Sequence, residues 1–322
     1  MEKFRSGLVV KLLSLPVILA SLVLFSGMGQ QILAGDKQQE KTLFKAKQTP
    51  DKTVYWVLPG QRELSKQVFG TTEDPKMTGK QQMKMAKGPM KELLGELPIL
   101  VGVPEKGRVE KDGKLYTKMP TPFSNKGKIV SGEFEMTLHD MQSHDRPKGA
   151  GDKAKVNMEF TDPAGNEYTI DVKKVIQPPL PGYETDGGVL TDGYHHGSTG
   201  TGTPLMPKVY TYGAFWGVGN VKVNGKVTDK MKVIHAMTTE TVRDKNYHLA
   251  HASELPLSQE NTIAGQKHHT HLVVLPVTVT KNGPKYQPVE TAFSLPNGKM
   301  QPFIHVMYEQ DQLVKAEFAG KQ

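Results

Sequence analysis

The segment Val209–Val242, VYTYGAFWGVGNVKVNGKVTDKMKVIHAMTTETV, predicts the fold more directly than any other part of the sequence. Two largely apolar runs flank the dipeptide Asn224-Gly225. An Asn-Gly pair is typical of a two-residue β-hairpin turn, because both central positions of a type I′ turn need a positive φ. We therefore predict two antiparallel strands that are joined at Asn224-Gly225.

Alternation of apolar and polar residues, with turn residues at regular intervals, continues on both sides of this hairpin. The turn Asp162–Asn166 separates two further alternating runs and predicts a second hairpin. Other strands are expected over the following stretches: 133–138, 155–160, 168–172, 271–280 and 303–308. Many short strands with few helical patterns predict a mainly β chain, an antiparallel β-sandwich or barrel-like domain over residues 98–322 with ten or more strands.

Residues 1–34 have the pattern of a secretory signal peptide. Three basic residues precede the uncharged, apolar run Leu12–Phe25, and small residues follow it up to Ala34. The run is shorter than the roughly 20 residues of a membrane-spanning helix. We expect cleavage near Gly35, a periplasmic or extracellular location and no membrane span afterwards, with an uncleaved anchor as the alternative.

The charge divides the rest of the chain into two unlike parts. Residues 35–120 hold 17 Lys and Arg against 11 acidic residues, whereas residues 121–322 hold 21 of each and all 11 histidines. We interpret residues 35–97 as a polar, basic N-terminal extension that is partly helical, with an amphipathic pattern over Met77–Leu97 interrupted at Gly88-Pro89. We expect such an extension to bind an anionic envelope surface or a protein partner. Nucleic acid is not expected, because the lysines stand singly with few aromatic residues between them.

The chain has no cysteine. This excludes disulfides, cysteine-ligated iron–sulfur clusters and the cysteine-containing blue-copper site. The zinc-protease motif His-Glu-x-x-His and the nucleophile elbow Gly-x-Ser-x-Gly are also absent. No catalytic residue is predicted.

A His-x-Met pattern after an aliphatic residue occurs three times, at Leu138–Met141, Ile234–Met237 and Ile304–Met307. On a strand, residues two apart point to the same face, so each pair offers an imidazole beside a thioether. The pair is similar to the ligand pair of periplasmic copper chaperones. The upstream methionine spacing of those proteins does not occur here, so the resemblance covers the type of ligand and not a family.

The strand that begins near His269 carries a second pattern, His-x-His. His269 and His271 share a face with Val273 and Leu275, while Leu272 on the other face indicates a strand covered on both sides. A buried imidazole costs free energy unless it has a partner, and a shared metal ion meets this need. We expect at least three of the following side chains to converge on a metal ion: His235, Met237, His269, His271, His305 and Met307.

Thioether with imidazole is a soft to borderline donor set, so copper is favoured over zinc. Zinc needs no thioether, because the histidines alone can bind it. An internal duplication around residues 193–242 and 265–309 would explain why His-His, Asn-Gly-Lys and His-x-Met recur in the same order. The predicted function is that of an exported β protein that binds a transition metal through His and Met side chains. Two alternatives stay open: a β-barrel enzyme or small-ligand binder with inward histidines, and a structural or accessory subunit of an envelope complex.

Overall fold

The computed structural model describes most of the chain beyond residue 41. The described residues are 42–48, 51–64, 66–76, 88–96, 103, 105–141, 151–177, 188–195, 209–240, 242–243, 247, 249–251 and 268–317. The predicted signal peptide and its cleavage point lie outside these residues. Among the described helices, none combines the length and the apolar character needed to cross a membrane.

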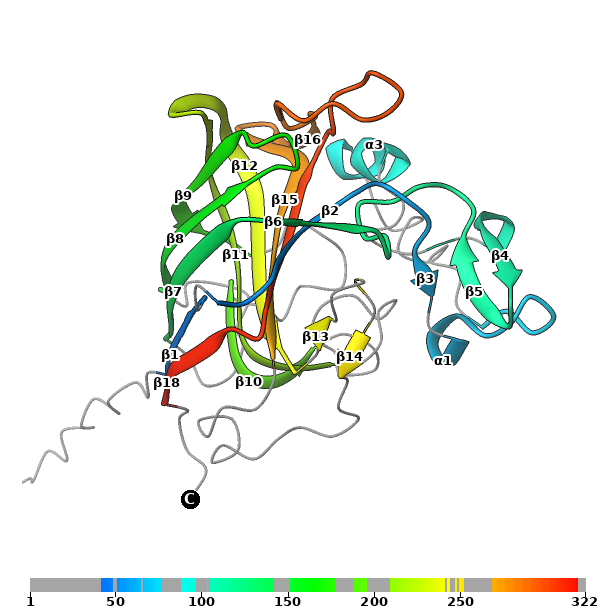
Figure 1. Cartoon of the computed structure of the whole chain (residues 1–322), viewed down its shortest axis with the longest axis horizontal. Helices are drawn as coiled ribbons and strands as arrows, with labels where there is room; N and C mark the ends of the chain where they lie inside the picture. Colours follow the sequence, from blue (N-terminus) through cyan, green and yellow to red (C-terminus); the bar gives the residue numbers. More distant parts are fainter. Residues whose placement is uncertain are drawn as a thin grey trace, which may run out of the picture. The chain divides into compact units, whose positions relative to one another are not determined.

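One antiparallel sheet of thirteen strands forms the body of the described chain (Figure 1). β10 (Val189–His195) pairs with β11 off the main path, and β16 (Gly283–Tyr286) pairs with β15. The main path runs in the order β18 (Gln312–Glu317), β1 (Thr42–Lys47), β7 (Gly132–Asp140), β8 (Lys153–Thr161), β9 (Glu167–Val175), β11 (Val209–Val223), β12 (Lys226–Thr239), β15 (His269–Thr280), β17 (Ile304–Glu309), β2 (Val54–Val57) and β6 (Gly127–Val130).

Smaller elements complete the fold, and Figure 1 shows a small sheet beside the main one. This three-stranded sheet has the order β3-β5-β4. The bounds of the smaller elements are β3 (Glu63–Leu64), α1 (Lys66–Phe69), α3 (Pro89–Glu96), a 3-10 turn (Glu105–Gly107), β4 (Arg108–Lys111), β5 (Lys114–Thr117) and the paired strands β13 (Val242–Arg243) and β14 (Leu249–His251).

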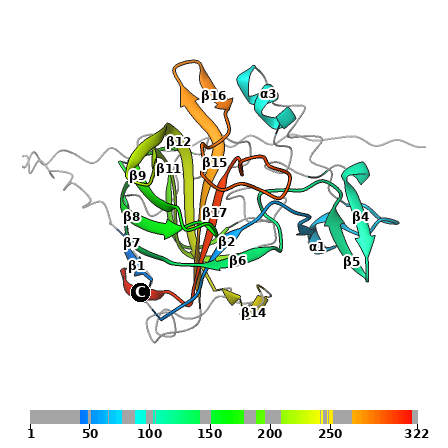
Figure 2. The ribbon, with the colours of Figure 1, turned by 45° about the horizontal axis from the view of Figure 1, so that its top comes forward.

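The main sheet curls into a half-barrel because its path returns on itself. β6 pairs with β2 at one end, and only Ser131 separates β6 from β7, which pairs with β1 and β8. Figure 2 shows β6 and β7 crossing in front of β12, β15 and β17. The curl therefore brings the two parts of the sheet face to face.

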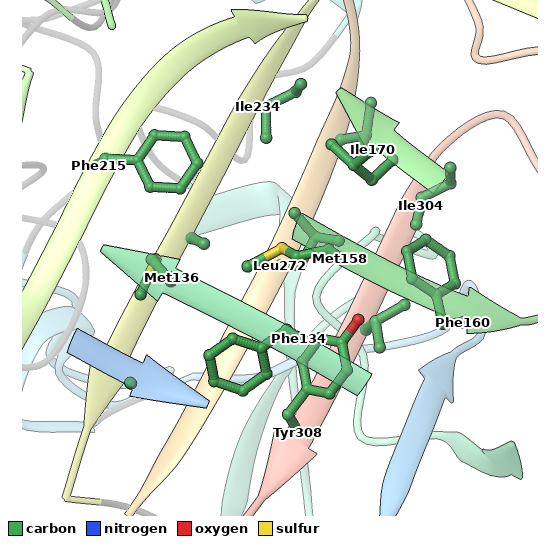
Figure 3. Close-up of a cluster of buried hydrophobic side chains, with 14 of the residues drawn as sticks. Phe134, Met136, Met158, Phe160, Ile170, Phe215, Ile234, Leu272, Ile304 and Tyr308 are labelled. Atoms are coloured by element: carbon green, nitrogen blue, oxygen red, sulfur yellow. The ribbon is translucent and has the colours of Figure 1, made fainter. Parts of the chain in front are cut away.

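Apolar side chains fill the space between the facing parts of the sheet. Phe134 and Met136 of β7 are in one buried cluster with Leu272 of β15 and Ile304 of β17 (Figure 3). The alternation in each strand directs these residues inward and their polar neighbours outward. The interior of the half-barrel is thus mostly a packed apolar core.

A second apolar cluster covers part of the outer face of β12 and β15. Val273 and Leu275 of β15 pack there in a cluster that includes Leu115 of β5, Phe69 of α1 and Leu93 of α3. A strand whose sequence is an almost unbroken run of apolar residues is typically buried on both faces. The two-sided burial expected of this strand is therefore present.

A buried ion pair holds the segment before β17 against β12. Lys232 is fully buried, and its Nζ lies 3.1 Å from Asp229 Oδ1. The same Nζ donates hydrogen bonds to the carbonyl oxygens of Gln287 and Pro288 at 2.7 and 2.8 Å. Burial lowers the pKa of Lys232, and the Asp229 carboxylate opposes that shift. A buried ammonium with several partners avoids the penalty of an unpaired charge.

The predicted mainly antiparallel β fold is confirmed. Asn224 and Gly225 have φ angles of 48° and 78° and join β11 to β12 in a tight hairpin, as their sequence predicts. The turn after β8 is also present, and Asp162 Oδ1 accepts hydrogen bonds from the backbone N–H groups of Ala164 and Asn166. Asx turns of this kind satisfy backbone donors locally.

The predicted N-terminal extension contains two strands of the main sheet. β1 and β2 both lie within residues 35–97, where we expected a polar extension outside the β domain. In β1, Phe44 and Ala46 are buried while Lys45 and Lys47 are not, so basic residues on the outer side masked a core strand. Residues 77–87 of the expected helix lie outside the described residues. Pro89 is the first residue of α3, a position that suits proline.

The two Asn-Gly pairs of the proposed duplication occupy different places in the fold. Asn224-Gly225 forms the tight turn between β11 and β12, whereas Asn297-Gly298 lies in the segment between β16 and β17. His235 and His305 do occupy equivalent positions on the two sides of β15. The duplication itself stays a prediction.

The packing of β1 across the core gives a test of the fold. A Cβ added at Gly213 of β11 would overlap the ring of Phe44, whereas one at Gly193 of β10 meets its nearest atoms only at 3.8 Å. We expect Gly213→Ala to lower the free energy of unfolding by about 1–3 kcal/mol and Gly193→Ala to have a much smaller effect. Denaturant unfolding measures both. In a Phe44→Ala background, Gly213→Ala should lower the free energy of unfolding by less than it does in wild type. An equal loss in both backgrounds would contradict this packing.

Candidate functional site

The outer face of β12, β15 and β17 carries a patterned group of histidine and methionine side chains. Directly opposite residues on antiparallel strands point to the same side of a sheet. Because β15 pairs with both neighbours in register, three rows cross the three strands. In order of β12, β15 and β17 these rows are His235, Val273 and His305; Met237, His271 and Met307; and Thr239, His269 and Glu309.

His271 stands at the centre of this group. Its ring centroid lies 5.2 Å from that of His235 and 5.8 Å from that of His305. His235 and His305 are only 6% and 4% exposed, whereas His271 is partly exposed. The outer two imidazoles are therefore embedded in the protein, and the central one is the most accessible to solvent.

Backbone carbonyls orient the two outer imidazoles in the same way. Nδ1 of His235 lies 2.9 Å from the carbonyl oxygen of Phe215, and Nδ1 of His305 lies 2.9 Å from that of Pro122. A carbonyl oxygen only accepts, so both Nδ1 atoms donate and each neutral ring keeps its lone pair on Nε2. Metal-binding histidines commonly donate their other N–H to a carbonyl in this manner.

Aromatic rings pack against both outer histidines. Trp216 of β11 stacks on His235 with centroids 4.2 Å apart and an interplanar angle of 18°. Phe123 meets His305 edge to face, with centroids 5.5 Å apart. Packing on one side and a hydrogen bond on the other restrict the orientation of each ring.

The two methionines are buried on opposite sides of His271. Each is 4% exposed. Met237 packs in a cluster with Leu190 and Ala214, and the hydroxyl of Thr211 lies 3.4 Å from its sulfur. Met307 belongs to a separate cluster with Tyr55, Val57 and Tyr247. Their thioethers thus lie in the row of His271, each in its own pocket of apolar side chains.

His269 lies one row further along β15 and has a different environment. Its Nδ1 is 3.3 Å from Glu309 Oε1, and both side chains are nearly buried. Its ring centroid is 6.4 Å from that of His271. Glu240, the residue after β12, is also buried; burial raises the pKa of its carboxyl to about 7, against the opposing effect of nearby His269. Of the six predicted ligands, His271 and the four around it thus form one group, and His269 lies apart beside carboxylates.

His195 is a further histidine of this region that was not among the predicted ligands. It is the last residue of β10 and is fully buried. Burial, followed by the proximity of His235, lowers the pKa of His195 to about 3. Apolar and polar residues do not alternate along Val189–His195, so a search for period-two patterns could not find this strand. His196 and the side chain of His251 lie outside what the structure describes, and His139 is partly exposed on β7.

A separate polar group lies at the start of β15 on the core side of the sheet. His268 Nε2 is 3.1 Å from Asp311 Oδ1, and the other carboxylate oxygen accepts a hydrogen bond from Thr270. Thr270 in turn shares a hydrogen bond with Thr238, with the two hydroxyl oxygens 2.6 Å apart. Burial raises the pKa of Asp311. Sequence reasoning did not find this group, because its residues come from β12, the start of β15 and the connection between β17 and β18.

The distances decide which imidazoles can share a metal ion. A nitrogen ligand at about 2.0 Å places its ring centre roughly 3 Å from the metal, so two rings on one ion have centres within about 6 Å. The pairs His235–His271 and His271–His305 satisfy this limit, and His269–His271 does not. Over the described part of the chain, no three His, Asp or Glu side chains are placed to hold one ion. A metal site with three protein ligands on this face would therefore include a thioether.

The buried state of His195 predicts how stability depends on pH. Its pKa is about 3 in the folded protein against the usual 6.5, so the unfolded chain binds more protons between these values. For metal-depleted protein we expect this residue to lower the free energy of unfolding by up to about 1.4 kcal/mol per unit as pH falls from 6.5 toward 3. His195→Gln should flatten the pH dependence seen in denaturant unfolding, and the control His139→Gln should not. Equal slopes in the two variants would contradict the burial of a neutral imidazole.

Comparison of the chain with protein-family models, with curated protein sequences and with solved structures finds no match in any of the three.

Proposed function

We propose that this protein is an exported β protein that binds a transition metal, with copper favoured over zinc, on the His271 face of its sheet. One observation carries the proposal: His271 lies in register between Met237 and Met307, with the rings of His235 and His305 within 6 Å of its own. Four donor side chains from the two neighbouring strands thus surround one partly exposed imidazole.

The donor set supports copper over zinc. Structural zinc sites are tetrahedral, with nitrogen, oxygen or thiolate ligands, and the described residues offer no group of three His or carboxylate side chains for one ion. Thioethers are soft ligands that favour cuprous copper, and both methionines stand opposite His271 in the strand register. Neutral imidazoles are needed as ligands, and burial lowers the pKa of His235 to about 4, so this ring is neutral at physiological pH.

The competing interpretation of an enzyme with inward histidines has less support. Side chains such as Leu272, Ile304 and Phe134 occupy the interior of the half-barrel, and the His271 group lies on the opposite face. An acid–base function would have to use the outer pair His269–Glu309 or the core-side pair His268–Asp311. The His268–Asp311 pair is hydrogen-bonded to the hydroxyl of Thr270, which is fully buried on the core side of the sheet.

Metal binding is tested by replacing the central ligand. We expect the purified protein to bind Cu(I), in competition with a chromogenic chelator, more tightly than it binds Zn(II). His271→Ala should lower the Cu(I) affinity at least tenfold, on the order of the losses seen when metal-site residues are removed. His139→Ala, which changes a partly exposed histidine of another His-x-Met pair, is the matched control and should bind as wild type does.

Binding also predicts a change in stability. Saturating Cu(I) should raise the melting temperature of wild type and His139→Ala, because a ligand that binds only the folded state stabilises it by mass action. His271→Ala should show no such rise. Wild-type protein that binds neither Cu(I) nor Zn(II) would contradict the proposed function.

Export is part of the proposal and has its own test. The signal peptide predicted over residues 1–34 implies a periplasmic or extracellular protein, where the basic residues of the N-terminal part would meet an anionic envelope surface or a protein partner. We expect N-terminal sequencing of protein produced with its signal to find a mature chain that begins near Gly35. An intact Met1 would indicate an anchor.

A further inference from the structure

We propose that the His271 cluster holds a single cuprous ion at either of two equivalent positions, each made by His271 together with one His-x-Met pair. The first position uses His235 and Met237 of β12, and the second uses His305 and Met307 of β17. This inference rests on the proposed function, and it adds the oxidation state of the metal, the ligands of each position and the number of ions bound.

The sheet register makes the two positions equivalent. Met237 and Met307 both lie opposite His271, one from each neighbouring strand. His235 and His305 both lie opposite Val273, two residues further along β15. The strand β15 thus runs between two copies of the same pair of ligands.

The surroundings of the two pairs are matched as well. Each outer histidine donates its Nδ1–H to a backbone carbonyl at 2.9 Å, and each packs against an aromatic ring. The exposed fractions are also alike, at 6% and 4% for His235 and His305 and 4% for both methionines. Different elements supply these contacts, Phe215 and Trp216 on one side and Pro122 and Phe123 on the other. Neither position has an evident advantage over the other.

Distances favour two positions over one central site. His271 lies within reach of either outer imidazole, at 5.2 and 5.8 Å between ring centroids. Yet in the described residues the three imidazoles do not converge as a group that can hold one ion. Adjacent strands are about 4.8 Å apart, so the backbones of His235 and His305 are separated by roughly twice that distance, with β15 between them. Two ring nitrogens and one thioether are what each side can supply.

The shared ligand limits occupancy to one ion. A neutral imidazole has one ring nitrogen that carries a proton and one that carries a lone pair. His271 therefore coordinates in only one position at a time, and occupation of one position empties the other. A three-ligand set with a thioether suits Cu(I), a soft ion. Reorientation of the partly exposed His271 would move the ion across β15 without release.

The experiment compares three variants by anaerobic Cu(I) titration against a chromogenic chelator. They are His235→Gln with Met237→Leu, His305→Gln with Met307→Leu, and all four substitutions together. Each two-residue variant should still bind one Cu(I), with an affinity lowered only about twofold, the statistical weight of one of two equal positions. The four-residue variant and His271→Ala should lose binding. X-ray absorption should show two nitrogens and one sulfur in wild type and in both two-residue variants.

The outcomes separate this inference from the proposed function. Wild-type protein that binds no Cu(I) overturns both. If either two-residue variant binds Cu(I) more than about thirtyfold more weakly than wild type does, the ligands form one convergent site. That result overturns the two positions and leaves the proposed function intact. Binding of two Cu(I) ions per chain would also contradict the sharing of His271 between the two positions. If circular dichroism shows that a two-residue variant does not fold, its methionine substitution alone, Met237→Leu or Met307→Leu, replaces it. The Cu(I) affinity should again fall about twofold.

Discussion

The register of β15 between β12 and β17 is the constraint on which the rest of the structure depends. A shift of one residue would exchange the two faces of the strand, sending His269 and His271 into the apolar core and Leu272 out of it. Leu272 and Val274 pack inside the half-barrel, while Val273 and Leu275 pack under the small sheet. Because both faces are buried, apolar contacts on both sides oppose such a shift.

That same constraint sets the boundary of the candidate site. On the outer face of β15 the apolar residues Val273, Leu275 and Val277 are covered by the second cluster, and the face changes to polar and soft side chains from His271 toward His269. The second apolar cluster thus anchors the strand, and the histidine rows lie directly beside it. Imidazoles held next to a packed cluster lose little further entropy when they bind a ligand.

Electrostatics distinguish the parts of this polar surface. Burial lowers the pKa values of His195 and His235, so these imidazoles are neutral near pH 7. His269 has a carboxylate neighbour instead, and the raised pKa of Glu240 shows how strongly this end of the sheet disfavours isolated charge. Neutral nitrogen and thioether donors are therefore gathered around His271, while the carboxylates lie one row away. The proposal of copper rests on this separation of soft from hard donors.

The sequence by itself determined the class of the fold and identified the candidate donor side chains. Alternation and the Asn224-Gly225 turn are local signals, because period and turn chemistry depend only on neighbouring residues, and His-x-Met on a strand places both side chains on one face. Only the tertiary structure decided which strands lie together. It placed β1 and β2 in the main sheet, although the basic surplus of residues 35–120 had suggested an extension. It also set His271 between the two His-x-Met pairs, with His269 beside Glu309. Pairing between strands distant in sequence depends on the packing of the whole sheet, and no local pattern carries that information.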